Sequence, residues 1–101
     1  MSRVLIFDTN FSVKPIYDSL KEENYEVFVI GVNPNDSLCS PDYNWINTNY
    51  SNLSKCLEII EDYKIDNIIP GGNDFSYLIC SQLSEILGLD YLDGYEISKK
   101  N

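Results

Sequence analysis

The chain has 101 residues, 44% of them hydrophobic, and a formal net charge of −9. This length supports one domain with a single core, and the apolar content excludes a disordered chain. The acidic balance argues against nucleic acid or an anionic membrane as partner, and no apolar run is long enough for a membrane span. Three cysteines without C-x-x-C spacing, and no histidine, argue against disulfides or zinc and favour the cytoplasm.

The first third of the chain alternates between strand and helix patterns. Residues 3–8 form a strand that is continuously apolar from Val4 to Phe7, which is typical of a sheet covered on both faces. A loop over residues 9–12 follows, and Pro15 then falls in the first turn of a helix, where its missing N–H costs nothing. The apolar positions of this helix share one face: Val13, Ile16, Tyr17 and Leu20. Asn24 is expected to end the helix in a left-handed conformation, before a second strand over residues 25–31.

A polar connection over residues 32–42 is too long for a simple turn, and we expect it to be mobile or to cover a ligand. Residues 43–47 form a short third strand, and Ser51 or Asn52 caps a second helix. The predicted buried face of that helix consists of Leu53, Cys56, Leu57, Ile60 and Tyr63.

Residues 65–77 organise the rest of the chain, because they combine a buried strand, a tight turn and a helix start. Pro70 cannot donate to a sheet ladder and ends the strand. Gly71 and Gly72 allow positive φ and close approach of another molecule to the backbone. In parallel α/β sheets, ligands bind at loops of this kind.

Asp74 or Ser76 is expected to accept the first free N–H groups of the third helix, and Gly88 to end it. The apolar positions of this helix are Phe75, Leu78, Ile79, Leu83, Ile86 and Leu87.

The alternation of elements predicts an α/β fold of the Rossmann-like, three-layer type, with a parallel sheet of four strands in the order 3-2-1-4. Tyr91 and Leu92 could add a short fifth strand. In this order the loops over residues 8–12 and 70–77 face one crevice. Residues 93–101 begin a helix with capping-box form but stop after about one turn, so the sequence looks cut off there.

The crevice would hold neutral groups suited to positioning a carboxylate or phosphate: Asn10, Asn73 and Ser76. Each could equally be an ordinary turn or cap residue. Tyr77 could line the crevice or pack on the first helical turn. Asp8 and Asp74 could share a magnesium ion, although a strand end and a helix cap explain them better.

The sequence lacks the residues that several common activities require. The loop after the first strand has no glycine, which argues against a nicotinamide or flavin site, and a P-loop lysine is absent. A phosphate-receiver domain would need an acidic cluster there and an aspartate ending the third strand, which instead ends in Asn47, Thr48 and Asn49. No Ser-His, Cys-His or paired-carboxylate set is present, so a complete enzyme is hard to build from these residues.

The whole chain resembles the N-terminal, pre-ATP-grasp domain of ATP-grasp ligases such as the large chain of carbamoyl-phosphate synthetase. The resemblance depends on five stretches in order: Val4-Leu5-Ile6, Tyr25-Glu26-Val27, Tyr50-Ser51-Asn52-Leu53, residues 65–74, and Leu87-Gly88-Leu89 followed by residues 94–100. It implies a pre-ATP-grasp domain over residues 1–92, and over residues 93–101 the start of a truncated helix or linker leading to ATP-grasp lobes that the chain lacks.

The resemblance further implies that ATP and magnesium are bound by those lobes, so that this chain holds no cofactor and contacts a small-molecule substrate. The residues carried over are Thr9, Asn10, Phe11, Ser12, Gly71, Gly72, Asn73 and Asp74, with Ser76 and Tyr77 at the helix start. Biotin carboxylase-like members have an acid where Tyr77 stands, so the substrate stays open. The alternatives are a flavodoxin-like binding or signalling module, such as a degenerate receiver, and a structural domain that self-associates as a homodimer.

Overall fold

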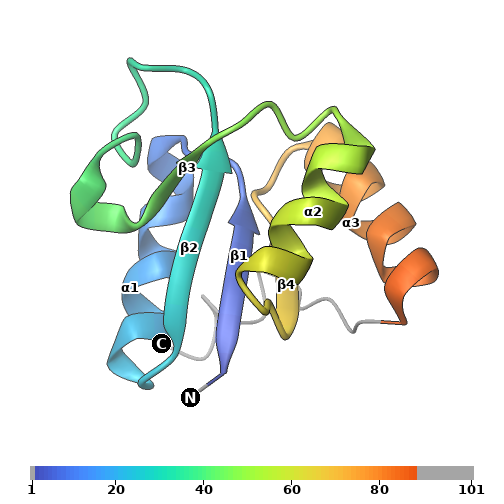
Figure 1. The fold of residues 1–101 in the computed structure, drawn as a ribbon. Coiled ribbons are helices and arrows are strands. Elements are labelled where there is room, and N and C mark those ends of the chain that lie inside the picture. Colours follow the sequence, from blue (N-terminus) through green and yellow to red (C-terminus); the bar gives the residue numbers. More distant parts are fainter. Residues whose placement is uncertain (1, 89–101) are drawn as a thin grey trace.

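Four parallel strands form the centre of the protein, in a computed structural model that describes residues 2–88 (Figure 1). Their order is β3-β2-β1-β4, so the predicted α/β class and strand order are confirmed. The strands are β1 (Arg3–Phe7), β2 (Glu26–Gly31), β3 (Trp45–Asn47) and β4 (Asn67–Pro70). The helices are α1 (Lys14–Glu22), α2 (Leu53–Asp62) and α3 (Asp74–Leu87), with 3-10 turns η1 (Phe11–Val13) and η2 (Pro41–Tyr43). The predicted strand at residues 91–92 and the helix start at 93–101 lie outside the described residues.

Strand β1 pairs with both β2 and β4, and its last residue, Phe7, lies opposite Pro70. Because parallel strands end at the same edge, the loops after β1 and β4 leave the sheet side by side. A flavodoxin-like sheet would place β3 beside β1. Here β4 occupies that position, so the flavodoxin-like and receiver hypotheses are wrong.

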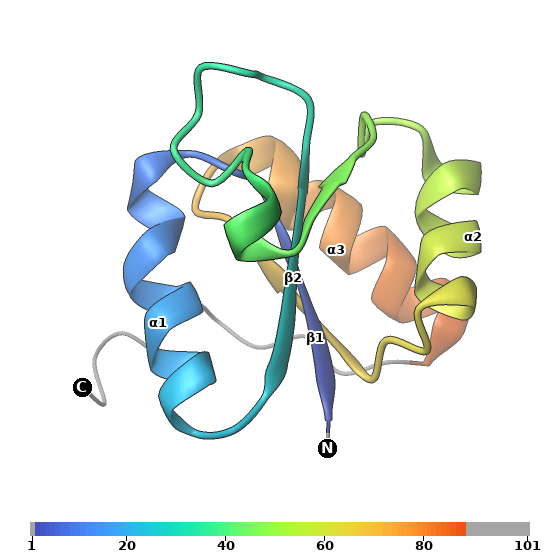
Figure 2. The ribbon, with the colours of Figure 1, turned by 60° about the vertical axis from the view of Figure 1, so that its left-hand side comes forward.

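Helices cover both faces of the sheet, with α1 on one face and α2 and α3 on the other (Figure 2). The alternating side chains of the strands supply two cores accordingly. Leu5, Phe7 and Ile68 face α2 and α3, whereas Val4, Ile6, Val13, Ile16, Val27, Val29 and Ile69 lie in the core under α1. Cys56 and Cys80 are buried on the α2–α3 side as free thiols, as their helical positions predict.

The helix ends largely follow the predicted signals. Asn24 has a φ of 68° and Gly88 a φ of 67°, both left-handed, after α1 and α3 respectively. Asn52, one of the two predicted caps, accepts a hydrogen bond from the Lys55 amide at the start of α2. Tyr63 is the exception on α2: it is the C-cap residue and is exposed, because it lies beyond the last buried turn.

The connection between β2 and β3 is anchored to the fold. Leu38 is fully buried in the core under α1, and its amide donates to the Thr9 carbonyl at 3.2 Å. The third strand is shorter than predicted, because η2 takes up Tyr43 and Asn44 then adopts a left-handed conformation. None of the described helices is both long enough and apolar enough to cross a bilayer.

Candidate functional site

The carboxylate of Asp8 connects the two loops at the carboxyl edge of β1 and β4. One oxygen, Oδ1, accepts hydrogen bonds from the backbone amides of Thr9 at 2.7 Å and Asn10 at 3.3 Å. The other, Oδ2, accepts from the side-chain amide of Asn73 and from the Tyr50 hydroxyl at 3.4 Å. A half-buried carboxylate with four donors fixes the relative position of both loops.

Tyr50 extends this network into an aromatic cluster. Its ring packs edge-on against Phe7, with 5.8 Å between centroids, and stacks on Phe75 at 5.6 Å. Burial raises the pKa of the Tyr50 hydroxyl; a hydrogen bond with Asn73 opposes the shift, and the Asp8 charge adds to it. The hydroxyl therefore stays protonated and serves Asp8 as a donor.

Asn73, and not Asp74 or Ser76, is the N-cap residue of α3. Both predicted cap residues are therefore wrong, since the cap lies one residue before Asp74 and three before Ser76. Asn73 keeps an extended backbone, and its Oδ1 accepts from the Ser76 amide at 2.8 Å. Asp74 is already helical, and the buried Ser76 hydroxyl is otherwise engaged: it accepts from the Gly71 amide at 3.0 Å and donates to the Asn73 carbonyl at 2.8 Å. Asn73 thus uses both ends of its amide, one on α3 and one on Asp8.

The two glycines of the loop serve different purposes. A Cβ on Gly71 would come within 2.4 Å of both the Phe7 carbonyl oxygen and the Asp8 Cβ, so a side chain there cannot be accommodated without movement. Gly72 has a φ of 96° and open space around its Cβ position. Gly71 therefore allows the loops to pack together, and Gly72 leaves the backbone accessible from outside.

In the turn after β1, the amides of Thr9, Asn10 and Ser12 donate to side chains of the protein. Asp8 accepts from the first two amides, and the Asn10 side chain accepts from the Ser12 amide at 2.9 Å and from the Ser12 hydroxyl. A dinucleotide-binding Rossmann domain offers the amides of this turn to a pyrophosphate. Here a carboxylate fills that position, which disfavours the same mode of binding.

The ten predicted site residues lie at this one edge but differ in exposure. Thr9 and Ser76 are fully buried, and the Thr9 hydroxyl donates to Asp36 at 2.8 Å. Gly71 is buried and Asn10 and Asn73 are half-buried, while the exposed members are Phe11, Ser12, Gly72, Asp74 and Tyr77. Phe11 is 74% exposed, the highest value among the large hydrophobic side chains described. Ligand contact stays a prediction for the accessible residues. Thr9 and Ser76 are buried beneath the surface and would support those residues rather than touch a ligand.

A magnesium ion between Asp8 and Asp74 would have to displace existing hydrogen bonds, because both Asp8 oxygens already accept from protein donors. Among residues 2–88, no three His, Cys, Asp or Glu side chains are grouped so that they could hold a metal ion. The hydrogen-bonding role of Asp8 is therefore the one that the geometry supports.

Comparison with known proteins places the fold but not the family. No protein-family model and no curated protein matches the sequence. Among solved structures, apo saccharopine dehydrogenase from Saccharomyces cerevisiae is similar with a TM-score of 0.72 and 16% identity, over 92% of this chain and 21% of that one. The dTDP-glucose 4,6-dehydratase of Bacillus anthracis, in complex with NAD, has a TM-score of 0.70 and 10% identity, over 92% and 37%.

The biotin carboxylase domain of a single-chain bacterial carboxylase is also similar, with a TM-score of 0.63 and 12% identity, over 96% of this chain and 25% of that one. The chain thus spans between a fifth and two fifths of the length of these three structures. At such low identity the likeness shows the fold alone, which is Rossmann-like and is shared by a dehydrogenase, a dehydratase and a carboxylase domain.

Two residues at the centre of the network are not among the predicted site residues. These residues are Asp8 and Tyr50. The sequence pattern favours a role for Asp8 as the end of the first strand. In the sequence, Tyr50 stands out only as part of the stretch before the second helix that resembles ATP-grasp ligases. A sequence signal exists for Asp8, since it is the first polar residue after an apolar strand at the expected edge. Tyr50 lies 42 positions away from Asp8, and nothing local to it indicates that contact.

Proposed function

We propose that this chain is the N-terminal substrate-binding domain of an ATP-grasp ligase, which joins a carboxylate to an amine or a related nucleophile. In this proposal the edge of β1 and β4 forms one wall of the substrate site, and the chain is not catalytic alone. ATP and magnesium belong to lobes outside these 101 residues. The strand order, the ordered sequence stretches and the likeness to a biotin carboxylase domain are consistent with the proposal.

The observation that carries the proposal is the occupied turn after β1. The saccharopine dehydrogenase and the dTDP-glucose dehydratase share the fold at least as closely as the carboxylase domain, so the fold does not choose between their functions and a ligase domain. The Asp8 carboxylate takes the amides that a dinucleotide pyrophosphate would need, and adds a negative charge there. This favours the ligase domain over a dinucleotide-binding domain.

The other loop remains open to an anionic group. At the start of α3 the amides of Asp74 and Phe75 have no acceptor within the helix, as in any first helical turn. The adjacent Gly72 leaves the backbone approachable. We therefore expect a carboxylate of the substrate to lie over the α3 start, with Asn10, Phe11 and Ser12 contacting the rest of the substrate from the β1 side.

Titration of the isotope-labelled chain, followed by amide NMR shifts, tests this function. Amino acids, small carboxylates and bicarbonate are compared with NAD, NADP and ATP-magnesium. Substrate-like carboxylates should shift the amides of residues 9–12 and 71–77, and the nucleotides should not. Saturable shifts at residues 8–12 with NAD or NADP would overturn the proposal in favour of a dinucleotide site.

Two glycines provide a matched pair for the same titration. Gly72→Ala and Gly88→Ala each place a Cβ in open space at positive φ, so they strain the backbone similarly at opposite ends of α3. Only the first narrows the approach to the loop, and only it should weaken carboxylate binding. In addition, coding sequence following Asn101, when expressed in frame, should confer ATP hydrolysis that depends on an acceptor.

A further inference from the structure

The carboxylate of Asp8 occupies a position that other groups of the chain surround with hydrogen-bond donors. The backbone amides of Thr9 and Asn10 donate to its Oδ1. The Asn73 side-chain amide and the Tyr50 hydroxyl donate to its Oδ2. Each oxygen thus has two donors, as in a bound carboxylate whose lone pairs are satisfied. We call these four donor groups the carboxylate cradle.

The cradle is assembled from three segments that lie far apart in the sequence. The two backbone amides belong to the loop after β1, the hydroxyl belongs to a residue before α2, and the side-chain amide belongs to the N-cap residue of α3. The loop after β4 packs so closely on Asp8 that a Cβ on Gly71 would come within 2.4 Å of the Asp8 Cβ. The cradle is therefore a walled position that fits the side chain of Asp8.

The backbone at Asp8 indicates that this side chain is kept at a cost. Its φ of 155° is one that residues with a Cβ rarely adopt and that glycine adopts readily. Dinucleotide-binding domains use glycines in the turn after their first strand. Backbone strain persists only where the surrounding structure holds it, and it is concentrated at ligand sites. The position therefore requires the hydrogen bonds of a carboxylate, since glycine would follow the same path of the chain with less strain.

We propose that the carboxylate cradle is a binding site for a small monocarboxylate and that Asp8 is its internal ligand, which keeps free anions out of the site in the native chain. A tethered carboxylate excludes a free one because its binding costs no translational freedom. Asp8→Gly empties the cradle and leaves its donors without their acceptor, which is unfavourable. Acetate has the same carbon and oxygen atoms as the missing side chain and can take its place.

The donors of the cradle determine the charge of the ligand that it accepts. They are backbone amides, a side-chain amide and a hydroxyl, and among the described residues no Lys or Arg donates to Asp8. The chain as a whole has a net charge of −9. Such a site suits one negative charge shared by two oxygens. A phosphate or sulfate dianion brings a second charge and further oxygens that find no donor there, so the cradle selects carboxylates.

Urea unfolding of Asp8→Gly in sodium acetate, with sodium chloride at equal ionic strength as the reference, tests the site. A ligand as small as acetate should bind with a dissociation constant on the order of 10 mM. About 100 mM acetate should then raise the folding equilibrium constant of Asp8→Gly about tenfold. The native chain and Asp8→Asn are the controls, because a side chain still fills the cradle in both. The gain of Asp8→Gly should exceed theirs at least about fivefold.

Three results of this measurement overturn the proposal: no effect of acetate on Asp8→Gly, equal stabilisation of all three proteins, or a larger effect of phosphate than of acetate. If Asp8→Gly does not fold in chloride, recovery of its circular dichroism spectrum in acetate supports the site. Without such recovery, Asp8→Ala, which also removes the carboxylate, is titrated in the same way and judged by the same results.

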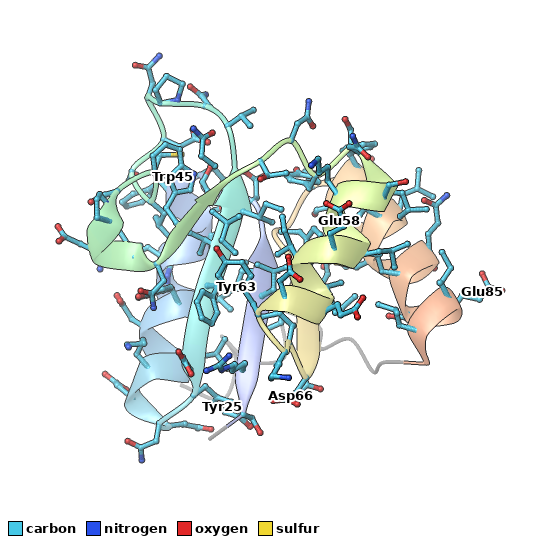
Figure 3. All side chains as sticks on the ribbon, viewed as in Figure 1. Tyr25, Trp45, Glu58, Tyr63, Asp66 and Glu85 are labelled. Carbon is cyan, nitrogen blue, oxygen red and sulfur yellow. The ribbon has the colours of Figure 1, made fainter. Side chains whose placement is uncertain are left out.

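A second substitution in the Asp8→Gly chain tests whether acetate uses the donors of the cradle. Tyr50→Phe removes one donor but keeps the ring that packs on Phe7 and Phe75, and it should weaken acetate binding about three- to tenfold. Tyr63→Phe is the matched control. Tyr63 lies at the end of α2, and its ring packs on Phe28 with centroids 5.3 Å apart (Figure 3).

The control should change the dissociation constant of acetate by less than about twofold, since it removes a hydroxyl outside the cradle. Equal weakening by both substitutions, or by neither, contradicts the site.

The cradle and the proposed ligase function can fail separately. The ligase function is tested by carboxylates binding to the native chain, in which Asp8 closes the cradle. Acetate that stabilises the native chain and Asp8→Gly equally would agree with a substrate site at the start of α3 and refute the cradle. Acetate that stabilises Asp8→Gly alone would establish the cradle and leave the ligase function to its own titration.

Discussion

The hydrogen bond between Asp8 and Asn73 has a direction that can be reversed by exchanging the two residues. In the native chain Asn73 donates its amide N–H to Asp8 and uses its Oδ1 to cap α3. Asp8→Asn turns an acceptor into a donor, so two amide N–H groups face each other. Asn73 cannot rotate to relieve this without losing the cap, which is worth about 1 kcal/mol.

The exchange predicts a specific pattern of stabilities. A hydrogen bond to a charged group contributes about 1.5–3 kcal/mol, so Asp8→Asn should lower the free energy of unfolding by about 2 kcal/mol. Asn73→Asp keeps the cap but opposes two carboxylates, and should cost a similar amount. In the double variant the new amide at position 8 donates to the new carboxylate at position 73, which still caps α3. The carbonyl oxygen of that new amide still accepts from the Thr9 backbone. The double variant should therefore lie within about 1 kcal/mol of the native chain, for a coupling of about 3 kcal/mol.

Urea unfolding of the four proteins, followed by circular dichroism, measures the cycle. The midpoints should shift while the slope with urea stays constant, which shows that the folded and unfolded states keep their character. A coupling below about 0.5 kcal/mol, the usual error for independent sites, would refute the idea that this contact joins the two loops.

Four further outcomes follow from the same edge and from the core behind it. Gly71→Ala should lower the urea midpoint more than Gly72→Ala, by about 2 kcal/mol or more in unfolding free energy, because its Cβ meets backbone whereas that of Gly72 meets open space. Thr9→Val removes the donor to the β2–β3 connection while keeping the shape, and should increase amide hydrogen exchange across that connection at a cost of about 1 kcal/mol. Burial raises the pKa of Cys56 to about 11 and of Cys80 to about 12, so both thiols should resist labelling at pH 8 until the chain unfolds. Because the unfolded thiols ionise near 9, stability should fall as the pH rises from about 9 to 11, and a Cys80→Ala variant should lose part of that dependence, as unfolding at each pH would show.

Periodicity predicted the architecture well because the strands and helices have different apolar repeats. The continuous run from Val4 to Phe7 and the shorter pair Ile68-Ile69 indicated buried parallel strands; β1 lies in the centre of the described sheet and β4 at its edge, and both runs are buried. The strand order followed from crossover rules and chain alternation rather than from any single residue. The left-handed helix ends at Asn24 and Gly88 were predicted because few residues tolerate positive φ.

The helix start at α3 and the exposure of several apolar residues of that helix were harder to predict. Asn73, Asp74 and Ser76 are all good cap residues, and the choice among them depends on which one keeps an extended backbone after the glycine turn. Apolar positions such as Leu78 and Ile86 fit helical spacing, but spacing does not say how much of a wide apolar arc the sheet can cover. Both features depend on tertiary placement that local sequence does not encode.

The division of backbone donors between the two loops limits what the edge can bind. In the loop after β1, the amides of Thr9 and Asn10 donate to the Asp8 side chain, and the Ser12 amide donates to the Asn10 side chain. The first amides of α3, by contrast, have no acceptor within their helix. Because Asp8 and Asn10 already accept from amides of the β1 turn, an anionic group of a ligand finds backbone donors on the α3 side, in the amides of Asp74 and Phe75. The exposed Phe11 on the β1 side is suited to an uncharged part of the same ligand. On the proposed function, this edge would orient a molecule with a charged end and an apolar end, as one wall of a ligase substrate site.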